Sequence, residues 1–364
     1  MLLPGTGGLQ SGLTISNFSL ISPLEMNGET HPCAAPFRAG QKDKAMQQDT
    51  MDTLDEDLSG LKPVQWQARM AALAEENGMY QPLGNRHFAT FIDQGNTLLV
   101  SFETIQGIHN LSDVAQPLGF DLVKNLGWSH LCLVSNGDTW FRNERIFGFF
   151  DQLIDDGFFE EFDKVVFYGA GPCGYAAAAF SVAAPGATVV AIQPQATLDP
   201  AIAGWDERFS EERRLDFTSR YGYAPDMMDA AQEGFVLYDP HQHLDAMHAA
   251  LFARKNVTRL ALPNLGGTVQ TRLIEMEILY NTIALAGAGK LTKRRFFQLY
   301  RARRNNAAYL RNVMARLDQD DRPYLVTLLC RNVAQRMRAP RFRRRLQNLE
   351  KRAEAGEFRL PPSR

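Results

Sequence analysis

The stretch Val165-Val-Phe-Tyr-Gly-Ala-Gly-Pro-Cys-Gly-Tyr-Ala-Ala177 decides the fold. The apolar run that ends at Tyr168 has the length and composition of a buried strand, and the alanine-rich run from Cys173 is typical of a helix. The turn between them consists almost entirely of small residues. Glycine in such a turn allows positive φ angles and lets a helix pack closely on a strand. The segment therefore predicts a tight strand–turn–helix unit.

Apolar runs and amphipathic segments alternate on both sides of this unit. Because strands that are apolar on both faces need helices to cover them, the alternation predicts an α/β fold with a mainly parallel sheet and helices on both faces. The predicted strands are residues 97–102, 130–135, 164–168, 188–192, 234–238 and 258–262. The predicted helices are residues 144–157, 173–184, 244–252 and 269–286, with a connection at 118–127.

The rest of the chain divides into segments of different composition. The first fifty residues mix Gly, Pro, Ser and Thr without a helical or strand period, which predicts disorder. One or two helices are predicted next, because apolar residues recur there at helical spacing. The predicted organisation is a disordered extension (1–50), an α/β domain (51–289) with leading helices (54–77), a basic helical region (290–346) and a frayed tail (347–364).

The charge distribution sets the C-terminal part apart from the remainder. Residues 290–364 hold 21 Lys/Arg and 6 Asp/Glu, which gives this part a net charge of +15. Because the whole chain has a net charge of −2, the first 289 residues have a net charge of −17. Arginines alternate with Phe, Tyr and Leu between Lys290 and Arg345, which predicts basic amphipathic helices. Such a region can bind a polyanion, a membrane surface or an acidic protein surface, including that of its own chain.

Composition is that of an ordinary globular protein, with 45% hydrophobic and 22% charged residues. No apolar run approaches the ~20 residues that a membrane-spanning helix needs. The cysteines lie far apart and form no CxxC pair, so the sequence predicts neither a zinc site nor a disulfide framework. We therefore predict a cytoplasmic protein with no metal and no cofactor, whose thiols are reduced: Cys33, Cys132, Cys173 and Cys330.

Nucleotide binding is one explanation of the glycine-rich turn. Gly169, Gly171 and Gly174 spell GxGxxG, and N–H groups at a helix start can hold a phosphate. Two features oppose it: the next strand ends without the acidic residue that binds ribose hydroxyls, and Pro172 removes one N–H donor. A nucleotide- or S-adenosylmethionine-dependent enzyme stays as an alternative, as does a turn with a purely structural role.

A nucleophile elbow of the GxSxG type is the other explanation. Tyr168–Ala177 resembles the YGxSxGGYAA turn of bacterial α/β-hydrolase-like proteins found alongside glycan and polysaccharide enzymes. Residues 193–200, Gln-Pro-Gln-Ala-Thr-Leu-Asp-Pro, are similar to the SPQxxLDP loop of that group. Tyr238-Asp-Pro240 resembles the strand end that carries its triad acid, and Leu265-Gly-Gly-Thr-Val269 resembles its LGHxV histidine loop. Four segments in the same order imply the α/β-hydrolase fold.

Most of the catalytic triad that the resemblance implies is missing. The serine position holds Gly171 and the histidine position holds Gly267, so only Asp239 remains. A serine hydrolase needs a hydroxyl to attack and an imidazole to take its proton. Loss of the triad lowers the rate by about 10⁶-fold. The resemblance thus implies a non-catalytic protein that binds a glycan, a nucleotide sugar or a partner protein at the former cleft.

Altered chemistry at the same site is a second alternative. Cys173 lies in the first turn of the predicted helix, where a helix N-terminus can lower the pKa of a thiol. A cysteine- or aspartate-based hydrolase or transferase would use Cys173 and Asp239. His241, His243 and His248 follow Asp239 and offer a displaced base, and His241 with His243 could form a metal pair. A surface loop with His248 on the following helix explains them as well.

Further ligand-binding residues are predicted at strand ends, because open parallel sheets bind ligands at the carboxyl ends of their strands. The predicted set is Glu103, Asp138, Gly169, Gly171 and Gln195. A phosphoadenosine phosphosulfate reductase, a name often given to chains that look like this one, would carry an SGGxDS motif and a late ECGxH cysteine. Neither motif is present, so this activity is an alternative by name only.

Overall fold

The computed structural model describes residues 54–362. The chain divides into two compact units, Met1–Lys42 and Asp43–Arg364, and all described residues belong to the second. The disorder predicted for residues 1–50 lies outside the described residues.

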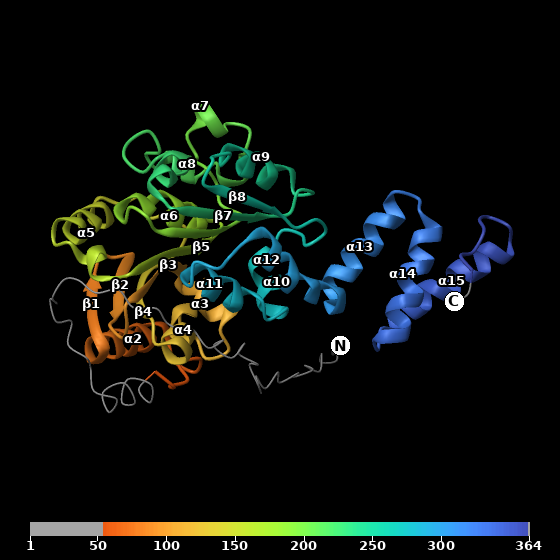
Figure 1. Ribbon diagram of the computed structural model, residues 1–364, viewed down its shortest axis with the longest axis horizontal. Helices are drawn as coiled ribbons and strands as arrows, with labels where there is room; N and C mark the ends of the chain where they lie inside the picture. Colours follow the sequence, from red (N-terminus) through yellow and green to blue (C-terminus); the bar gives the residue numbers. More distant parts are fainter. Residues whose placement is uncertain (1–53, 363–364) are drawn as a thin grey trace, which may run out of the picture. The chain divides into compact units, whose positions relative to one another are not determined.

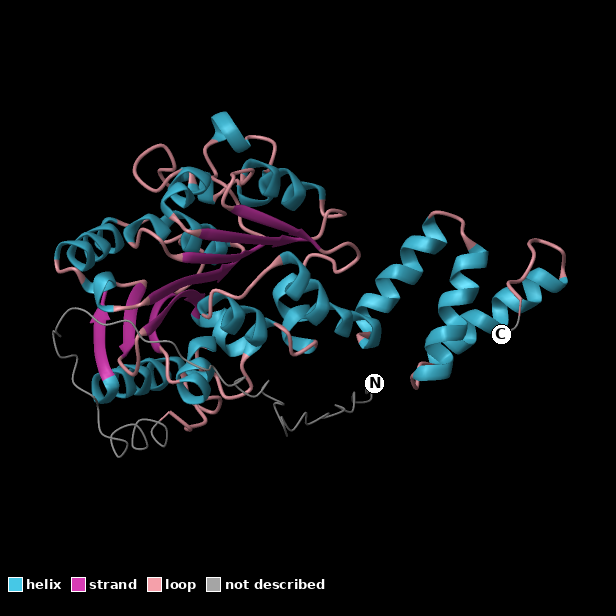
Figure 2. Ribbon diagram, viewed as in Figure 1, coloured by secondary structure: helices cyan, strands magenta, loops and turns pink. Residues whose placement is uncertain are grey.

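One eight-stranded sheet forms the centre of the fold, in the order β1-β2-β4-β3-β5-β6-β7-β8 (Figure 2). Neighbouring strands from β4 and β3 to β8 are parallel, while β1 and β2 are antiparallel to their neighbours. The six predicted strands are confirmed. The strands are β1 (Gly78–Pro82), β2 (His87–Ile92), β3 (Thr97–Thr104), β4 (Ser129–Ser135), β5 (Lys164–Ala170), β6 (Thr188–Ile192), β7 (Glu233–Tyr238) and β8 (Val257–Ala261).

Helices cover both faces of the sheet (Figure 1), which confirms the predicted α/β class. On one face lie α5 (Glu144–Asp155), α6 (Pro172–Phe180), α8 (Ala224–Met227) and α9 (His243–Leu251). On the other lie α2 (Pro63–Asn77), α3 (Ile105–Leu111), α4 (Leu118–Leu126), α10 (Val269–Glu275) and α11 (Leu279–Gly287). Short connecting helices are η1 (Phe158–Glu161), η2 (Ser181–Ala183), α7 (Pro200–Ala203), η3 (Glu207–Phe209), η4 (Glu212–Arg214) and η5 (Met228–Ala230).

Three predicted elements differ from the structure. The segment 118–127, predicted as a connection, is the helix α4. The helix predicted at 269–286 is two helices, separated at Glu277, which has a φ of 58°. The leading helix begins only at Pro63, because the proline ring fixes φ and suits the first helical position.

Side chains on the central strands alternate between two cores. Leu98 and Val100 of β3 pack with α5 and α6, whereas Leu99 packs with α4 and α11. The same alternation separates Val189 from Val190 in β6. Since both faces are buried, these strands are continuous apolar runs, which is the pattern from which the parallel sheet was predicted.

The basic region consists of helices, as predicted. Phe296 and Tyr300 share a core with Leu265 and Val269, so its first part packs on the α/β domain. Its later helices have a small core of their own that includes Cys330. The helices are α12 (Lys293–Leu299), η6 (Tyr300–Asn305), α13 (Ala307–Gln319), α14 (Pro323–Arg336) and α15 (Pro340–Glu354).

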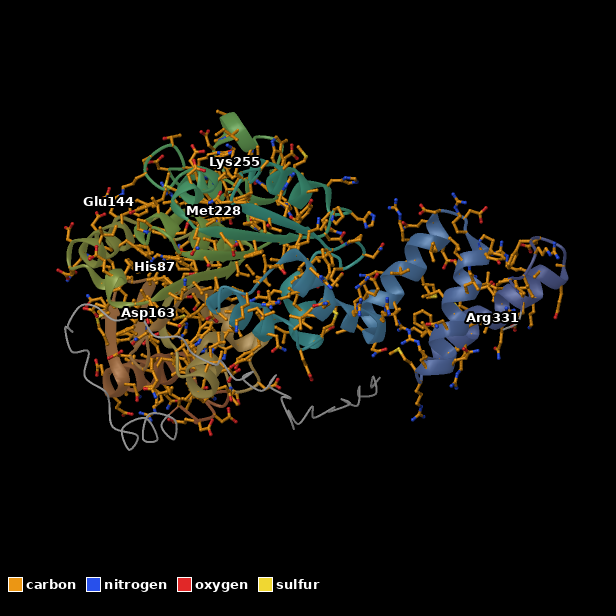
Figure 3. The ribbon with its side chains drawn as sticks, viewed as in Figure 1. His87, Glu144, Asp163, Met228, Lys255 and Arg331 are labelled. Atoms are coloured by element: carbon orange, nitrogen blue, oxygen red, sulfur yellow. The ribbon has the colours of Figure 1, made fainter. Side chains whose placement is uncertain are left out.

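The end of the described chain is held against α14. The guanidinium of Arg331, labelled in Figure 3, donates to the carbonyl oxygen of Pro361 at 2.7 Å. α15 continues to Glu354, so residues 347–354 are helical where a frayed tail was predicted. Between residues 54 and 362, no helix is both long enough and apolar enough to cross a membrane.

Candidate functional site

The turn between β5 and α6 is sharp and is anchored at both ends. Gly171, which precedes α6, has φ 57° and ψ −126°, a region that side chains rarely adopt. Its N–H donates to the carbonyl oxygen of Ile192 in β6 at 2.8 Å, and its own carbonyl accepts the N–H of Tyr175 at 3.0 Å. The strand, the helix and the neighbouring strand therefore hold this residue in place.

Packing excludes a side chain at one glycine of the turn and disfavours one at another. A Cβ on Gly169 would lie 2.0 Å from the carbonyl oxygen of Cys173. A Cβ on Gly174 would lie 3.1 Å from the carbonyl oxygen of Ile192. In both cases the obstacle is backbone, which cannot rotate away, so these glycines explain why strand and helix approach so closely.

The two glycines at the expected triad positions face open space. A Cβ on Gly171 would meet no atom within 4 Å. The nearest atom to a Cβ on Gly267 would be Oε1 of Gln242, at 3.9 Å. Neighbouring atoms therefore do not exclude a Cβ at either position.

Asp239 follows β7 and is 1% exposed. Its Oδ2 accepts the N–H of Gly266 at 2.6 Å, and its Oδ1 accepts the N–H of His241 at 2.9 Å. The Nδ1 atom of exposed His241 lies 3.4 Å from Oδ1 and accepts the N–H of Asn264 at 3.3 Å. The carboxylate therefore holds two loops together through their backbone N–H groups. Gly267, which follows Gly266, has no imidazole.

Gln193 joins the loop of Gly267 to the end of β6. Its side-chain Nε2 donates to the carbonyl oxygen of Gly267 at 3.2 Å and to Oδ2 of Asp245 at 2.6 Å. Its Oε1 accepts the N–H of Val269 at 2.9 Å. Gln193 has a φ of 47°, which a side chain adopts only where surrounding contacts enforce it.

These contacts bring the three expected triad positions to the same edge of the sheet. Gly171 is bonded to residue 192, the side chain of the next residue holds Gly267, and the N–H of Gly266 reaches Asp239. The carboxyl ends of β5, β6 and β7 meet there, as expected for parallel strands. We call this edge, around residues 171, 239 and 267, the elbow edge.

Cys173 does not have the environment of a reactive thiol. Its side chain is buried in the first turn of α6 and is 7% exposed. Burial raises its pKa, and the carboxyl groups of Glu103 and Asp138 raise it further. The shift is opposite to the one expected at a helix start, so the thiol is protonated at neutral pH.

Two other residues singled out from the sequence, Gln195 and His248, are buried and hydrogen-bonded within the protein. Gln195 is 3% exposed, and its Nε2 donates to the carbonyl oxygen of Gln193 at 3.2 Å. His248 is 0% exposed: Nδ1 accepts the N–H of Ala196 at 3.1 Å, and Nε2 lies 3.0 Å from Oδ2 of Asp206. Burial lowers the pKa of His248. Both side chains are buried, and His248 lies on α9, the helix after the loop, where the sequence suggested it.

A polar cluster that the sequence analysis missed lies on β3 and β4. The ligating atoms of Glu103, His130 and Cys132 all lie within 4.8 Å of one another. The hydroxyl of Ser101 donates to Oε1 of Glu103 at 2.9 Å and lies 2.8 Å from Nε2 of His130. Burial raises the pKa of Glu103 to about 7 and lowers that of His130 to about 3.

The strand register explains why this cluster was missed. Ser101 lies opposite Cys132 in the β3–β4 pair, although they are far apart in sequence. The spacing of cysteines along the chain carries no information on which strands pair. The available signal was polar residues at alternate positions of two otherwise apolar strands, 101 and 103 in one and 130 and 132 in the other.

A cavity of about 400 Å³ lies away from the elbow edge. Lys164 and Ala187, which line it, stand at the amino ends of β5 and β6. The carboxyl ends of these strands form the elbow edge, so the cavity is at the opposite edge of the sheet. It includes none of the predicted site residues.

No protein-family model matches the chain, and no curated protein matches it. Among solved structures it is similar to the glycosylation associate protein (Gap123) complex from Streptococcus agalactiae, at 14% identity and a TM-score of 0.39 over 55% of this chain and 44% of that one. It is also similar to brefeldin A esterase, a bacterial homologue of human hormone-sensitive lipase, at 14% identity and a TM-score of 0.37 over 72% and 89%. A hyperthermophilic esterase from Pyrobaculum calidifontis shows 12% identity and a TM-score of 0.37 over 68% and 97%.

The chain spans less than half the length of the Gap123 chain that it matches. Identities and TM-scores this low say nothing about activity or ligand. The assignment to the α/β-hydrolase fold class rests on the eight-stranded, mainly parallel sheet and on the helices that cover both of its faces.

Proposed function

We propose that this protein is a non-catalytic member of the α/β-hydrolase fold class that binds its ligand at the elbow edge. The observation that carries the proposal is that Gly171 and Gly267 both face open space and offer no reactive group. Asp239, the remaining acid, is occupied by two backbone N–H groups. The frame of a hydrolase site is therefore retained without a nucleophile or a base.

A neutral glycan or a partner protein suits this edge better than a nucleotide sugar. The N–H of Gly171 is already bonded to β6, and Pro172 has none, so the turn lacks two donors for a phosphate. Glu103 and Asp138 lie near enough to Cys173 for their charge to raise its pKa, and their carboxylates would repel a phosphate. The same argument lowers support for a nucleotide- or S-adenosylmethionine-dependent enzyme.

The absence of serine-hydrolase chemistry can be tested with a fluorophosphonate probe on the full chain. We expect no covalent labelling of the protein as it exists. The variant Gly171→Ser/Gly267→His should gain slow labelling, because it puts a hydroxyl and an imidazole into the two open positions. The matched control is Gly186→Ser/Gly267→His, since Gly186 also has a positive φ and open space but precedes β6. Labelling of the unmodified protein would contradict the proposal.

Ligand binding can be tested by calorimetric titration with neutral oligosaccharides and, separately, with uridine diphosphate sugars. We expect binding of a neutral oligosaccharide that the variant Gly267→Phe abolishes, because the ring fills the open space. Gly148→Phe is the control, since Gly148 is exposed in α5 and is also free of neighbours. A nucleotide sugar that binds equally to both variants would contradict this location of the site.

The basic helices support a second contact, with an acidic surface or a polyanion. Arg341, Arg343 and Arg344 are exposed on α15, whereas Arg345 is paired with Asp318 at 2.7 Å. Neutralising the three exposed arginines by glutamine should weaken retention on heparin and flatten its dependence on salt. Equal retention of the variant and the parent chain would contradict this part of the proposal.

We further propose a cytoplasmic location for the protein. Cys132, Cys173 and Cys330, the cysteines that the structure describes, are buried and unpaired, as expected in a reducing compartment. Cell fractionation tests this location, and recovery of the protein outside the cytoplasmic fraction would contradict it.

A further inference from the structure

The polar cluster on β3 and β4 is enclosed by the sheet and by α4. Ser101 and Glu103 alternate on β3 with residues that face α5 and α6, so they point to the opposite side, where α4 lies. Gly119 of α4 lies directly on the imidazole of His130, because a Cβ at that position would be only 2.3 Å from Nε2. The N–H of Leu118, at the start of α4, donates to Oε2 of Glu103 at 3.3 Å. The helix thus closes the cluster from one side.

One separation within the cluster is that of two ligands around one metal ion, and the third ligand atom lies nearby. Zinc bound to sulfur, nitrogen and oxygen at about 2.0–2.3 Å in a tetrahedron keeps its ligand atoms about 3.3–3.7 Å apart. Cys132 Sγ and Glu103 Oε1 are 3.7 Å apart, and all three ligating atoms lie within 4.8 Å. The Ser101 hydroxyl lies at 2.8 and 2.9 Å from two of them, so a metal ion would replace its two hydrogen bonds by coordination.

The buried carboxylate of Glu103 has no cationic partner within the described part of the chain. Its contacts are a hydroxyl, one backbone N–H and a thiol, all of them uncharged groups. Burying an ionised carboxylate without an opposite charge is unfavourable, and a cation bound beside it offsets that cost. Glu103 is only partly enclosed, which leaves an ion a way in.

We propose that Glu103, His130 and Cys132 form a binding site for a zinc-class divalent cation. A thiolate, an imidazole and a carboxylate favour zinc or cobalt over magnesium or calcium, which prefer oxygen ligands alone. The fourth position falls to the hydroxyl of Ser101 or to a water molecule bonded to it. Binding displaces the thiol proton of Cys132 and any proton on the carboxyl group of Glu103, so between one and two protons are released per ion.

One hydrogen bond that usually supports a metal-binding histidine is missing at His130. Nδ1 of His130 is buried without a hydrogen-bond partner. Metal-binding histidines usually donate this N–H to an acceptor, and its loss lowers metal affinity by about 10- to 100-fold. The site should therefore bind zinc reversibly and lose it to a chelator.

Cobalt substitution of the full chain tests the proposal. After removal of metal with a chelator, titration with Co²⁺ should produce a near-ultraviolet thiolate-to-cobalt charge-transfer band that saturates at one ion per chain and is displaced by Zn²⁺. The variant Cys132→Ser should lose the band. The matched control is Cys330→Ser, which also removes a buried thiol but lies in the separate core of α14, and it should keep the band.

Absence of the band in the folded parent chain would overturn the site, as would a band that survives Cys132→Ser. If Cys132→Ser does not fold, Glu103→Gln keeps the shape of the side chain and should weaken Co²⁺ binding at least about tenfold. Unchanged affinity in that variant would overturn the proposal. X-ray absorption of the cobalt-loaded parent chain needs no variant and must show one sulfur ligand.

Discussion

The glycines of the turn between β5 and α6 differ from those of the elbow edge in the space around them. On the inner side, the backbone of α6 occupies the space of a side chain at Gly169, and the backbone of β6 lies in tight contact with that of Gly174. At the elbow edge, Gly171 and Gly267 have free space in front of them. The inner glycines allow the strand and the helix to approach closely, and the outer ones leave space at the edge of the sheet. Close packing of the turn and open positions at the elbow edge are therefore separate features of this sequence.

The largest expected effect is that of Gly169→Ala. The new Cβ would meet the carbonyl oxygen of Cys173 at 2.0 Å, and neither group can move without shifting the strand or the helix. We expect a loss of at least about 3 kcal/mol in the free energy of unfolding, measured by urea denaturation. A loss below about 1 kcal/mol would show that the inner side of the turn tolerates side chains, and the contrast between the two sides would disappear.

Asp239→Ala should have the next largest effect. It leaves the N–H groups of His241 and Gly266 without their acceptor, and hydrogen bonds to charged groups contribute about 1.5–3 kcal/mol each. We expect a loss of about 2–3 kcal/mol. Asp138→Ala is the matched control, because Asp138 is exposed, and its effect should stay within about 0.5 kcal/mol. Equal effects would show that Asp239 has no structural task at the elbow edge.

A pH dependence should come from His248, which packs behind the loop that follows β6. Burial lowers its pKa in the folded state below the ordinary histidine value, so the unfolded chain binds the proton more readily. Stability is therefore present above the ordinary pKa and is lost as the pH falls below it, with a slope of at most about 1.4 kcal/mol per pH unit. Chemical denaturation between pH 7 and pH 5 measures this slope. His243→Gln, at an exposed position, should leave it unchanged, and His248→Asn should reduce it. His87 and His130, whose pKa burial also lowers, keep their own contributions in both variants.

The smallest effects are expected at the elbow edge itself. Gly171→Ala should cost about 1–2 kcal/mol, because the residue keeps a positive φ that disfavours a Cβ although space is free. Gly267→Ala has neither strain nor a close neighbour and should stay within about 0.5 kcal/mol. Thermal unfolding of these two variants and of Gly169→Ala measures the loss of stability at each of the three positions. A Gly267→Ala variant as unstable as Gly169→Ala would refute the view that packing leaves this position free.

The strands of the parallel part of the sheet could be predicted because they are buried on both faces and are therefore apolar throughout. β1 and β2 could not, because their side chains are mixed and β1 is an edge strand that ends in Pro82. β2 forms through pairing with β4, which is a contact distant in sequence, and β1 pairs with β2. The helix α4 was missed as well, although Gly127 ends it in the left-handed conformation usual at a helix C-terminus.

The candidate site shows the same division. Motif order predicted the positions 171, 239 and 267, and the structure brings them to one edge through Gln193, whose bridging side chain no motif had indicated. Cys173 was predicted from its place at a helix start, a local feature, but its pKa is decided by burial and by carboxyl groups from other strands. Local spacing describes the helix dipole, whereas desolvation depends on everything packed around the residue.

By itself, the sequence determined the α/β class, the strand–turn–helix unit and the presence of glycine at positions 171 and 267, since apolar periodicity and residue identity are properties of the chain alone. Only the tertiary structure decided which glycines are free, what Asp239 bonds to, and that Glu103, His130 and Cys132 meet. The physical reason is that free space, hydrogen-bond partners and side-chain clusters depend on strand register and packing. Strand register and packing bring together residues that are far apart in the sequence, and their spacing along the chain does not indicate that they are in contact.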